Sequence, residues 1–225
     1  MISKLKDVIR DFVFGMEDGL VSNLGLVLGV YVGSGSSSAV ILAGLASMFA
    51  GAFSMSAGSY LSAKSQREVY EHEIADTRKQ LERNPKSCFQ EMRNILAQEG
   101  FGKSEIGILL KKSKKYKHPV FVCDYMVQKK VGISKEKLDL PLRNALTMFF
   151  SFLIGSSFPI VPFIFFNNIS VYVSIIMTIG VLFLVGMLKA KYTKLDKWKS
   201  GLEIVLIGVG AGILGYLVGW IISTF

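Results

Sequence analysis

The sequence predicts an all-α integral membrane protein, with five transmembrane helices and a small cytoplasmic helical domain inserted between helices two and three. About half of the 225 residues are apolar, and they gather in long runs. A helix of about 20 residues is needed to cross a bilayer core of roughly 30 Å. Runs of that length cover residues 12–33, 39–63, 145–166, 169–188 and 202–225.

The positive charges support the same fold class and predict its orientation. All 26 Lys and Arg residues lie in three segments, with three in 1–10, eighteen in 64–143 and five in 189–199. Basic residues accumulate on the cytoplasmic side of membrane proteins. We therefore expect the N terminus and residues 64–143 in the cytoplasm and the C terminus on the opposite side. Because this rule explains the net charge of +9, we expect no nucleic-acid partner.

Residues 1–63 are predicted to hold a surface helix and the first two transmembrane helices. In residues 1–11 the apolar side chains fall on one helical face, which indicates a short amphipathic helix on the membrane surface. The second apolar run contains no helix breaker between Ala39 and Asn84. We therefore expect this helix to continue well beyond the membrane.

Residues 64–143 are predicted to form the cytoplasmic stalk and helical domain. Pro85 suits the first turn of a new helix, and Gly100 suits the end of that helix. Apolar spacing predicts two further short helices, within 102–117 and 118–132. The two cysteines of the chain also lie here, and in the cytoplasm we expect free thiols.

Residues 144–225 are predicted to form transmembrane helices three to five. Pro159 and Pro162 predict a kink near the outer end of the third helix. Glycines recur at intervals of four, three and four residues in the fifth helix, at Gly208, Gly212, Gly215 and Gly219. Such a stripe predicts close packing against another helix.

Two adjacent acids, Glu17 and Asp18, interrupt the first apolar run. An unpaired charge at the depth expected for Asp18 costs at least about 2.5 kcal/mol, so some group must compensate for it. One interpretation is a cation or proton site. The other is that the acids lie near the interface and pair with Arg10 or a lysine of another segment. Glu17 lies about 100° around the helix from Asp18, so we expect different roles for the two.

The second helix offers a partner for such a site. Gly44, Gly51 and Gly58 recur every seven residues, and Met48 and Met55 recur at the same interval on a nearby face. Methionines in a membrane helix commonly serve packing alone. A thioether beside a carboxylate, however, suits a borderline transition metal rather than Mg²⁺ or Ca²⁺. The residues alone leave both interpretations open.

Two stretches resemble the vacuolar iron transporter family. They read FGMEDGLVSNLGLVLGV and LAGLASMFAGAFSMSAGSYLSAKSQREVYEHEI, and the likeness is specific over 12–74 and weaker over the rest of the chain. The resemblance implies a homodimer that exports Fe²⁺, or a related divalent metal such as Mn²⁺, from the cytoplasm. It also implies proton exchange and a path between the subunits. Asp18 matches the family's metal-binding acid in helix one, and Met55 matches its metal-binding methionine in helix two.

The cytoplasmic segment departs from the pattern of that family. The resemblance implies a cluster of Glu residues, assisted by Met, that collects metal, but only Glu91 and Met126 clearly remain. Other residues stand where ligands are expected, namely Ser59 in helix two and Thr77, Gln80, Cys88, Val127 and Lys130 in the segment. The segment holds 18 basic and 11 acidic residues, a balance that repels Fe²⁺. We therefore expect a degenerate metal-collecting domain.

The leading hypothesis is a divalent-metal transporter. Its candidate metal ligands are Asp18, Met55, Glu17, Glu91 and Met126. The alternative is a non-transporting membrane sensor or adaptor, whose basic domain binds lipid headgroups or a partner protein. The sequence shows no nucleophile–base pair, hydrolytic metal motif or cofactor loop, so we expect neither an enzyme nor a cofactor. We favour a prokaryotic cell membrane over a vacuolar membrane as its location.

Overall fold

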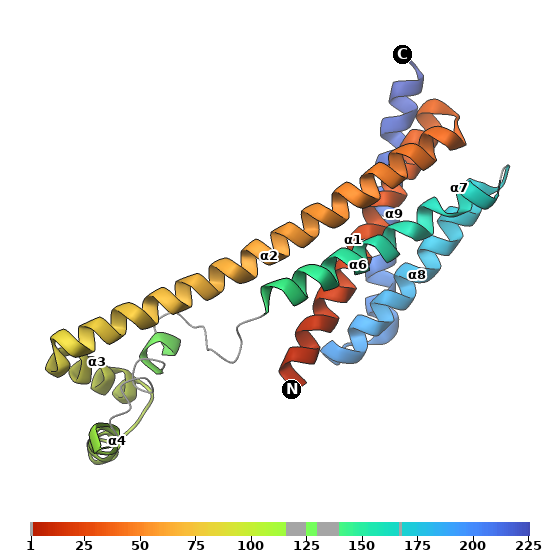
Figure 1. The fold of residues 1–225 in the computed structure, drawn as a ribbon. Coiled ribbons are helices and arrows are strands. Elements are labelled where there is room, and N and C mark those ends of the chain that lie inside the picture. The colour runs from red at the N-terminus through yellow and green to blue at the C-terminus, as the bar shows by residue number, and fades with distance from the viewer. Residues whose placement is uncertain (1, 116–124, 130–139, 167) are drawn as a thin grey trace. The chain divides into compact units, whose positions relative to one another are not determined.

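The computed structural model describes residues 2–115, 125–129, 140–166 and 168–225. Within these ranges every regular element is a helix (Figure 1). The chain divides into two compact units. Unit 1 comprises Met1–Leu61 and Pro141–Phe225, and unit 2 comprises Ser62–Leu140.

Unit 1 is a helix bundle built around its first helix. It contains α1 (Ile2–Ser34), the first part of α2 (Ser37–Arg83), α6 (Pro141–Ile160), α7 (Pro162–Phe165), α8 (Ser170–Thr193) and α9 (Lys197–Ser223). Helix α1 packs against α6, α8 and α9. The segment predicted as a separate surface helix, residues 1–11, is instead continuous with the first span from Ile2 onward, because no breaker separates them.

Four helices in the described part of the chain are long and apolar enough to cross a membrane. They are Val8–Ser34, Ser37–Gln80, Ser170–Lys191 and Lys197–Ser223. These helices coincide with the first, second, fourth and fifth predicted spans and support an integral membrane protein. The third predicted span, 145–166, is not among them. Arg143, Asn144 and several serines lower the apolar character of α6, which occupies that place.

A proline-associated break divides the third predicted span into two helices. Helix α6 contains Pro159 and ends at Ile160, and Pro162 begins the short helix α7. The hydroxyl of Ser174 in α8 donates a hydrogen bond of 2.8 Å to the carbonyl oxygen of Pro159. A neighbouring helix thus satisfies a carbonyl near the break, which allows this interruption inside the bundle.

Glycines let α1 approach two neighbours at once. A Cβ atom placed on Gly25 would lie 3.0 Å from the carbonyl oxygen of Ala211 in α9, and one on Gly29 would lie 2.9 Å from that of Gly215. On the α6 side, a Cβ atom on Gly19 would lie 2.6 Å from the carbonyl oxygen of Phe152. The predicted close packing of the α9 stripe is confirmed where it meets α1.

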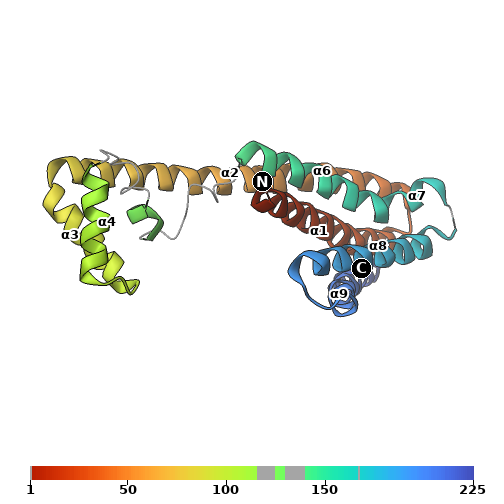
Figure 2. The same cartoon turned by 90° about the horizontal axis from the view of Figure 1, so that it is seen from below.

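The seven-residue glycine repeat of α2 faces α6 over part of its length. A Cβ atom on Gly44 would lie 2.9 Å from the side chain of Ile160, and one on Gly51 would lie 2.5 Å from the ring of Phe152. Around Gly58 no atom lies within 4 Å. The first two glycines therefore pack as predicted, and α2 runs beside α6 (Figure 2).

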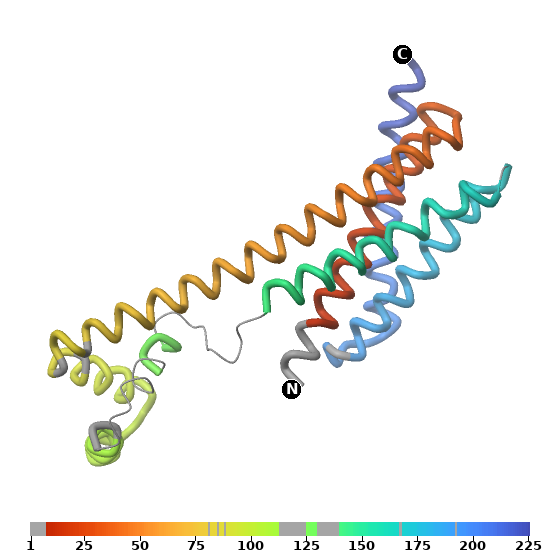
Figure 3. Tube along the Cα trace, viewed as in Figure 1, coloured from red at the N-terminus to blue at the C-terminus, as the bar shows by residue number. Residues whose placement is uncertain are grey.

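Unit 2 contains the second part of α2, α3 (Pro85–Gln98), α4 (Lys103–Lys115) and a short helical segment at 125–129 (Figure 3). The predicted boundaries of α3 are confirmed. The side chain of Asn84 accepts a hydrogen bond from the backbone of Ser87, and Gly100 adopts a φ of 91° after the helix. The rest of the helix predicted over 118–132 lies outside the described residues.

The predicted continuation of α2 beyond its apolar part is also confirmed. The helix is 47 residues long, and its second part is polar on most sides. Side chains one turn apart form exposed ion pairs there, including Arg67–Glu71 at 2.7 Å and Arg78–Glu82 at 3.4 Å. Such pairs stabilise a helix surface that lacks tertiary contacts.

Candidate functional site

The two acids of α1 are both half-buried, but different charges surround them. Glu17 lies within electrostatic reach of Lys189 in α8 and Glu203 in α9. For Asp18 the described residues provide no ion pair, and its backbone carbonyl accepts a hydrogen bond of 2.5 Å from Ser22. Arg10, considered as a partner from the sequence, contacts Asp11 at 3.1 Å. A lysine of another segment thus accompanies Glu17.

An apolar groove runs between α1 and α9 and begins on α1 at Val21. Its volume is about 720 Å³. The residues that line it come from both helices: Val21, Ser22, Gly25, Leu26, Gly29, Val30, Gly33, Ser34, Ala211, Leu214, Gly215, Val218, Gly219 and Ile222. Val21 and Ser22, which begin the groove on α1, lie one helical turn after Glu17 and Asp18 respectively.

The floor of the groove is made of glycine backbone and its rim of large apolar side chains. Gly25 and Gly29 of α1 meet Gly215 and Gly219 of α9 so closely that added Cβ atoms would overlap backbone. The rim includes Leu214, Val218 and Ile222, which are all exposed in the single chain. Inside a bilayer, this surface faces either lipid or another protein.

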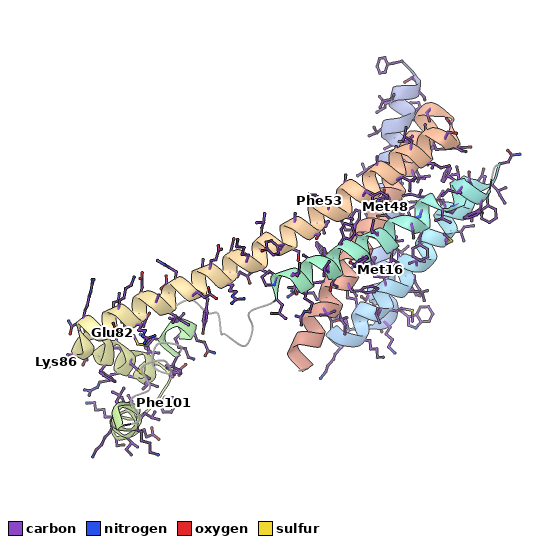
Figure 4. The ribbon with its side chains drawn as sticks, viewed as in Figure 1. Met16, Met48, Phe53, Glu82, Lys86 and Phe101 are labelled. Carbon is purple, nitrogen blue, oxygen red and sulfur yellow. The ribbon has the colours of Figure 1, made fainter. Side chains whose placement is uncertain are left out.

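Met55 belongs to α2. Both α2 and α1 pack against α6. The side chain of Met55 is half-buried. Met48, one heptad earlier, packs against a cluster that includes Val27, Val40 and Ile160 (Figure 4). Packing therefore explains Met48, whereas Met55 lies beyond this cluster and stays a candidate ligand.

The candidate ligands of unit 2 have different surroundings from each other. Met126 is fully buried among Met92, Leu96, Ile106 and Leu110, and Glu91 is half-buried on α3. Among the other expected positions, Thr77 and Val127 are buried, and Gln80 is exposed. Lys130 lies outside the described residues, as does the Cys88 side chain. Across the described part of the chain, no three His, Cys, Asp or Glu residues converge on one point.

One carboxylate of unit 2 binds a cation of the protein itself. Glu99, just after α3, pairs with the ammonium group of Lys129 and accepts a hydrogen bond from the hydroxyl of Tyr125. The same ammonium group lies 5.7 Å from the centre of the Tyr125 ring. These contacts tie the 125–129 helical segment to the end of α3. In the sequence only the adjacent Lys130 stood out, because it lies where the resemblance implies an acidic ligand.

Three further polar groups of unit 1 did not stand out in the sequence. Asn23 is fully buried, and its amide donates to the hydroxyl of Ser156 at 2.9 Å, which links α1 to α6. Asn23 is uncharged and lies inside an apolar run, so the sequence pattern did not mark it as a functional residue. Lys189 and Glu203 lie at the ends of their apolar runs, where charges are expected, so only the fold shows that they approach Glu17.

Comparison with known proteins identifies the family of this chain. Residues 9–220 match the VIT family. The chain is 31% identical to vacuolar iron transporter 1 of Eucalyptus grandis over 212 residues, which cover 93% of this chain and 84% of the relative. It is 28% identical to vacuolar iron transporter 1 of Arabidopsis thaliana, over 96% of this chain and 87% of the relative. The corresponding rice protein is 29% identical, over 93% and 83%. The chain therefore belongs to the VIT family.

Proposed function

We propose that this protein is a dimeric transporter that moves Fe²⁺, or a related divalent transition metal such as Mn²⁺, out of the cytoplasm. Its family membership and the names of its relatives support metal transport rather than an enzymatic activity. The observation that carries the proposal is the position of Asp18. This carboxylate is half-exposed on a transmembrane helix and forms no ion pair with the described residues.

A second copy of the chain and a bound metal ion would together offset the unfavourable free energy of placing the Asp18 carboxylate in the membrane. A lone carboxylate facing lipid is unfavourable by several kcal/mol. The apolar groove that begins on α1 at Val21, with glycines from both helices, fits a partner surface, because small residues allow helices to approach closely in lipid. One Asp18 from each subunit would then supply the two negative charges that offset a dication.

The remaining candidate residues have supporting roles in this proposal. Met55 would favour a transition metal over harder cations, since its thioether is a soft ligand. Protonation of Asp18 would weaken metal binding and release the ion, which couples transport to proton exchange. Glu17, accompanied by Lys189, would contribute less charge to the path.

The charge distribution supports the proposed orientation. In unit 1 the start of α1 and the α8–α9 connection lie at the same end (Figure 1). Both segments are rich in Lys and Arg, so we propose that this end and residues 64–143 are cytoplasmic. The preference for a prokaryotic cell membrane stays a prediction, and the plant relatives named above fit it poorly.

Unit 2 is proposed to have lost most of its metal-collecting ability. Glu99 already has Lys129 as its counter-charge, and Met126 is enclosed in an apolar core. A carboxylate site for several dications needs many converging acids. In the described part of unit 2, neither the acids nor the net charge provides this.

Transport into proteoliposomes tests the proposal. Purified protein would be assayed with Fe²⁺, Mn²⁺, Co²⁺ and Zn²⁺, with and without a pH gradient. We expect Asp18→Asn to reduce flux to the background of empty vesicles while the dimer still forms on size-exclusion chromatography. Glu17→Gln, a matched loss of one charge, should reduce flux less than about tenfold, equivalent to about 1.4 kcal/mol.

Three results would count against parts of the proposal. Undiminished transport by Asp18→Asn would remove Asp18 from the pathway. Absence of flux for all four metals in the unmodified protein would instead favour the sensor or adaptor alternative. Equal losses at Glu17 and Asp18 would show that the two acids are not distinguished by their surroundings.

A further inference from the structure

Helix α4 of unit 2 presents two contrasting faces. Ile106 and Leu110 point into the core of unit 2 and are only 3% and 6% exposed. On the opposite side, Ile108 is 58% exposed, although it is as apolar as the buried residues. Lys111 and Lys112 are exposed on either side of Ile108 around the helix. The outward face therefore combines a large apolar side chain with positive charge.

Two neighbouring residues extend this apolar surface. Leu109 is exposed on the flank of α4, and Phe101 is exposed just before the helix (Figure 4). Nothing in the core of unit 2 explains these positions, since its cluster is formed by other side chains. Three exposed large apolar residues within nine positions form a patch that suits a partially apolar partner.

The charge of the same segment is strongly one-sided. Residues 103–117 contain six lysines and one acidic residue, Glu105. The Glu105 carboxylate accepts a hydrogen bond of 2.7 Å from the backbone of Gly102, so it is engaged at the start of α4. With one acid among residues 103–115, α4 carries an excess of positive charge.

We propose that the outward face of α4 docks on anionic lipid headgroups at the membrane surface. Helices that lie in a membrane interface combine lysines with large apolar side chains, because the lysines meet headgroups while the apolar groups enter the acyl boundary. A nucleic acid would match the charge but would leave Ile108, Leu109 and Phe101 without an apolar partner. This inference is independent of metal transport.

The connectivity of the chain favours this partner over a soluble one. Unit 2 is inserted between two segments of unit 1, so both of its ends are attached to the membrane-embedded part of the protein. A lipid contact therefore needs no partner recruited from solution, and it forms if the stalk lets α4 reach the membrane surface, which the experiment below measures. Each lysine near an anionic surface contributes about 1 kcal/mol, which corresponds to about a fivefold change in the docking equilibrium.

Site-specific fluorescence on the full chain tests the proposal. In a background with Cys88→Ser and Cys123→Ser, an environment-sensitive probe would be attached to Ser104→Cys, which is exposed on the outward face of α4. The protein would be placed in nanodiscs of phosphatidylcholine, with or without phosphatidylglycerol. We expect a blue shift and protection from an aqueous quencher only with the anionic lipid, and loss of both in high salt.

Matched variants distinguish docking by α4 from a non-specific attraction between the basic domain and anionic lipid. Lys111→Gln with Lys112→Gln should lower the ratio of docked to undocked protein about 25-fold, at fivefold per lysine. Lys86→Gln with Arg93→Gln removes the same charge from exposed positions of α3 and should have little effect. Ile108→Ser should weaken docking without changing its salt dependence.

Three outcomes would overturn the proposal. Equal losses in the α3 and α4 variants would show that overall charge, not this face, attracts the lipid. Probe protection in phosphatidylcholine alone would indicate that protein covers α4, as in a contact with a second copy. Full exposure of the probe in anionic nanodiscs would show that α4 does not dock. Because both leaflets of a nanodisc have the same composition, the result does not depend on the orientation of the chain.

Discussion

Adjacent residues on one helix can have very different electrostatic surroundings. Glu17 lies within electrostatic reach of Lys189 in α8 and Glu203 in α9, whereas Asp18 forms no ion pair with the described residues. The sequence places both acids in the same apolar run, and the helical turn of about 100° between them separates their neighbours. Adjacent acids of one helix can therefore differ in the charges around them, and this difference underlies the separate roles proposed for Glu17 and Asp18.

At the residue scale, Met55→Leu tests whether a thioether selects the metal. Leucine keeps the size and apolarity of methionine but removes the sulfur ligand. We expect the preference for Fe²⁺ and Co²⁺ over Mn²⁺ to fall several-fold in competition transport assays, with little change in the total rate. Met48→Leu is the matched control, since Met48 belongs to a packing cluster. An unchanged order of preference in Met55→Leu would assign Met55 to packing too.

At the element scale, α1 is held between two helices by different kinds of contact. Toward α9 the contact is glycine against glycine, with Gly25 and Gly29 facing Gly215. Toward α6 the buried amide of Asn23 adds a hydrogen bond to Ser156. Lipid provides no hydrophobic force between helices, so close packing and such polar links hold the bundle together.

Substitution of Gly215 by alanine tests the α1–α9 contact. A Cβ atom there would overlap the carbonyl oxygen of Gly25, whereas around Gly210, in the same helix, no atom lies within 4 Å of the added Cβ. We expect Gly215→Ala to destabilise the protein by about 1–3 kcal/mol, as overpacking does. Gly210→Ala should keep or raise stability, because alanine favours helices more than glycine does.

Thermal unfolding in detergent measures this difference. The two variants should shift the apparent melting temperature in opposite directions, or only Gly215→Ala should lower it. Equal behaviour of the two variants would mean that α1 and α9 pack less closely than the structure indicates. The same comparison also isolates the packing effect from intrinsic helix propensity, since both substitutions are identical and lie in one helix.

At the scale of the whole molecule, the sequence predicts the helices better than it predicts their contacts. Apolar run length determines where a helix can span a bilayer, and the four spans in the structure follow it. The lack of a breaker after Ala39 correctly predicts one long α2 helix. The break at Val161 was expected only as a kink, because its form depends on packing by α8.

The candidate site was less accessible to sequence reasoning than the fold. Lys189 and Glu203 belong to α8 and α9, which lie far along the chain from Glu17 in α1, so no local pattern could join them. The pairing of Glu99 with Lys129 likewise depends on how two segments pack. Asp18 stood out because a charge inside an apolar run is conspicuous before any fold is known.

The number of membrane crossings is decided by α6. At 20 residues and about 1.5 Å per residue, α6 reaches about 30 Å, enough to cross a bilayer core. Its polar residues Asn144, Ser151 and Ser156 are buried within the bundle, so lipid would meet its apolar side. We therefore expect α6 to cross the membrane as the third of five spans, despite its lower apolar content.

Cysteine labelling from one side of the membrane tests this count. In a background with Cys88→Ser and Cys123→Ser, single cysteines would replace Ser36, Asn168 or Lys194 in sealed vesicles of known orientation. If α6 crosses, position 168 lies on the same side as position 36, and position 194 lies on the opposite side. If α6 does not cross, the chain after it is inverted, so positions 36 and 194 share a side instead. A membrane-impermeant maleimide should therefore label 36 and 168 together, and joint labelling of 36 and 194 would reduce the protein to four spans.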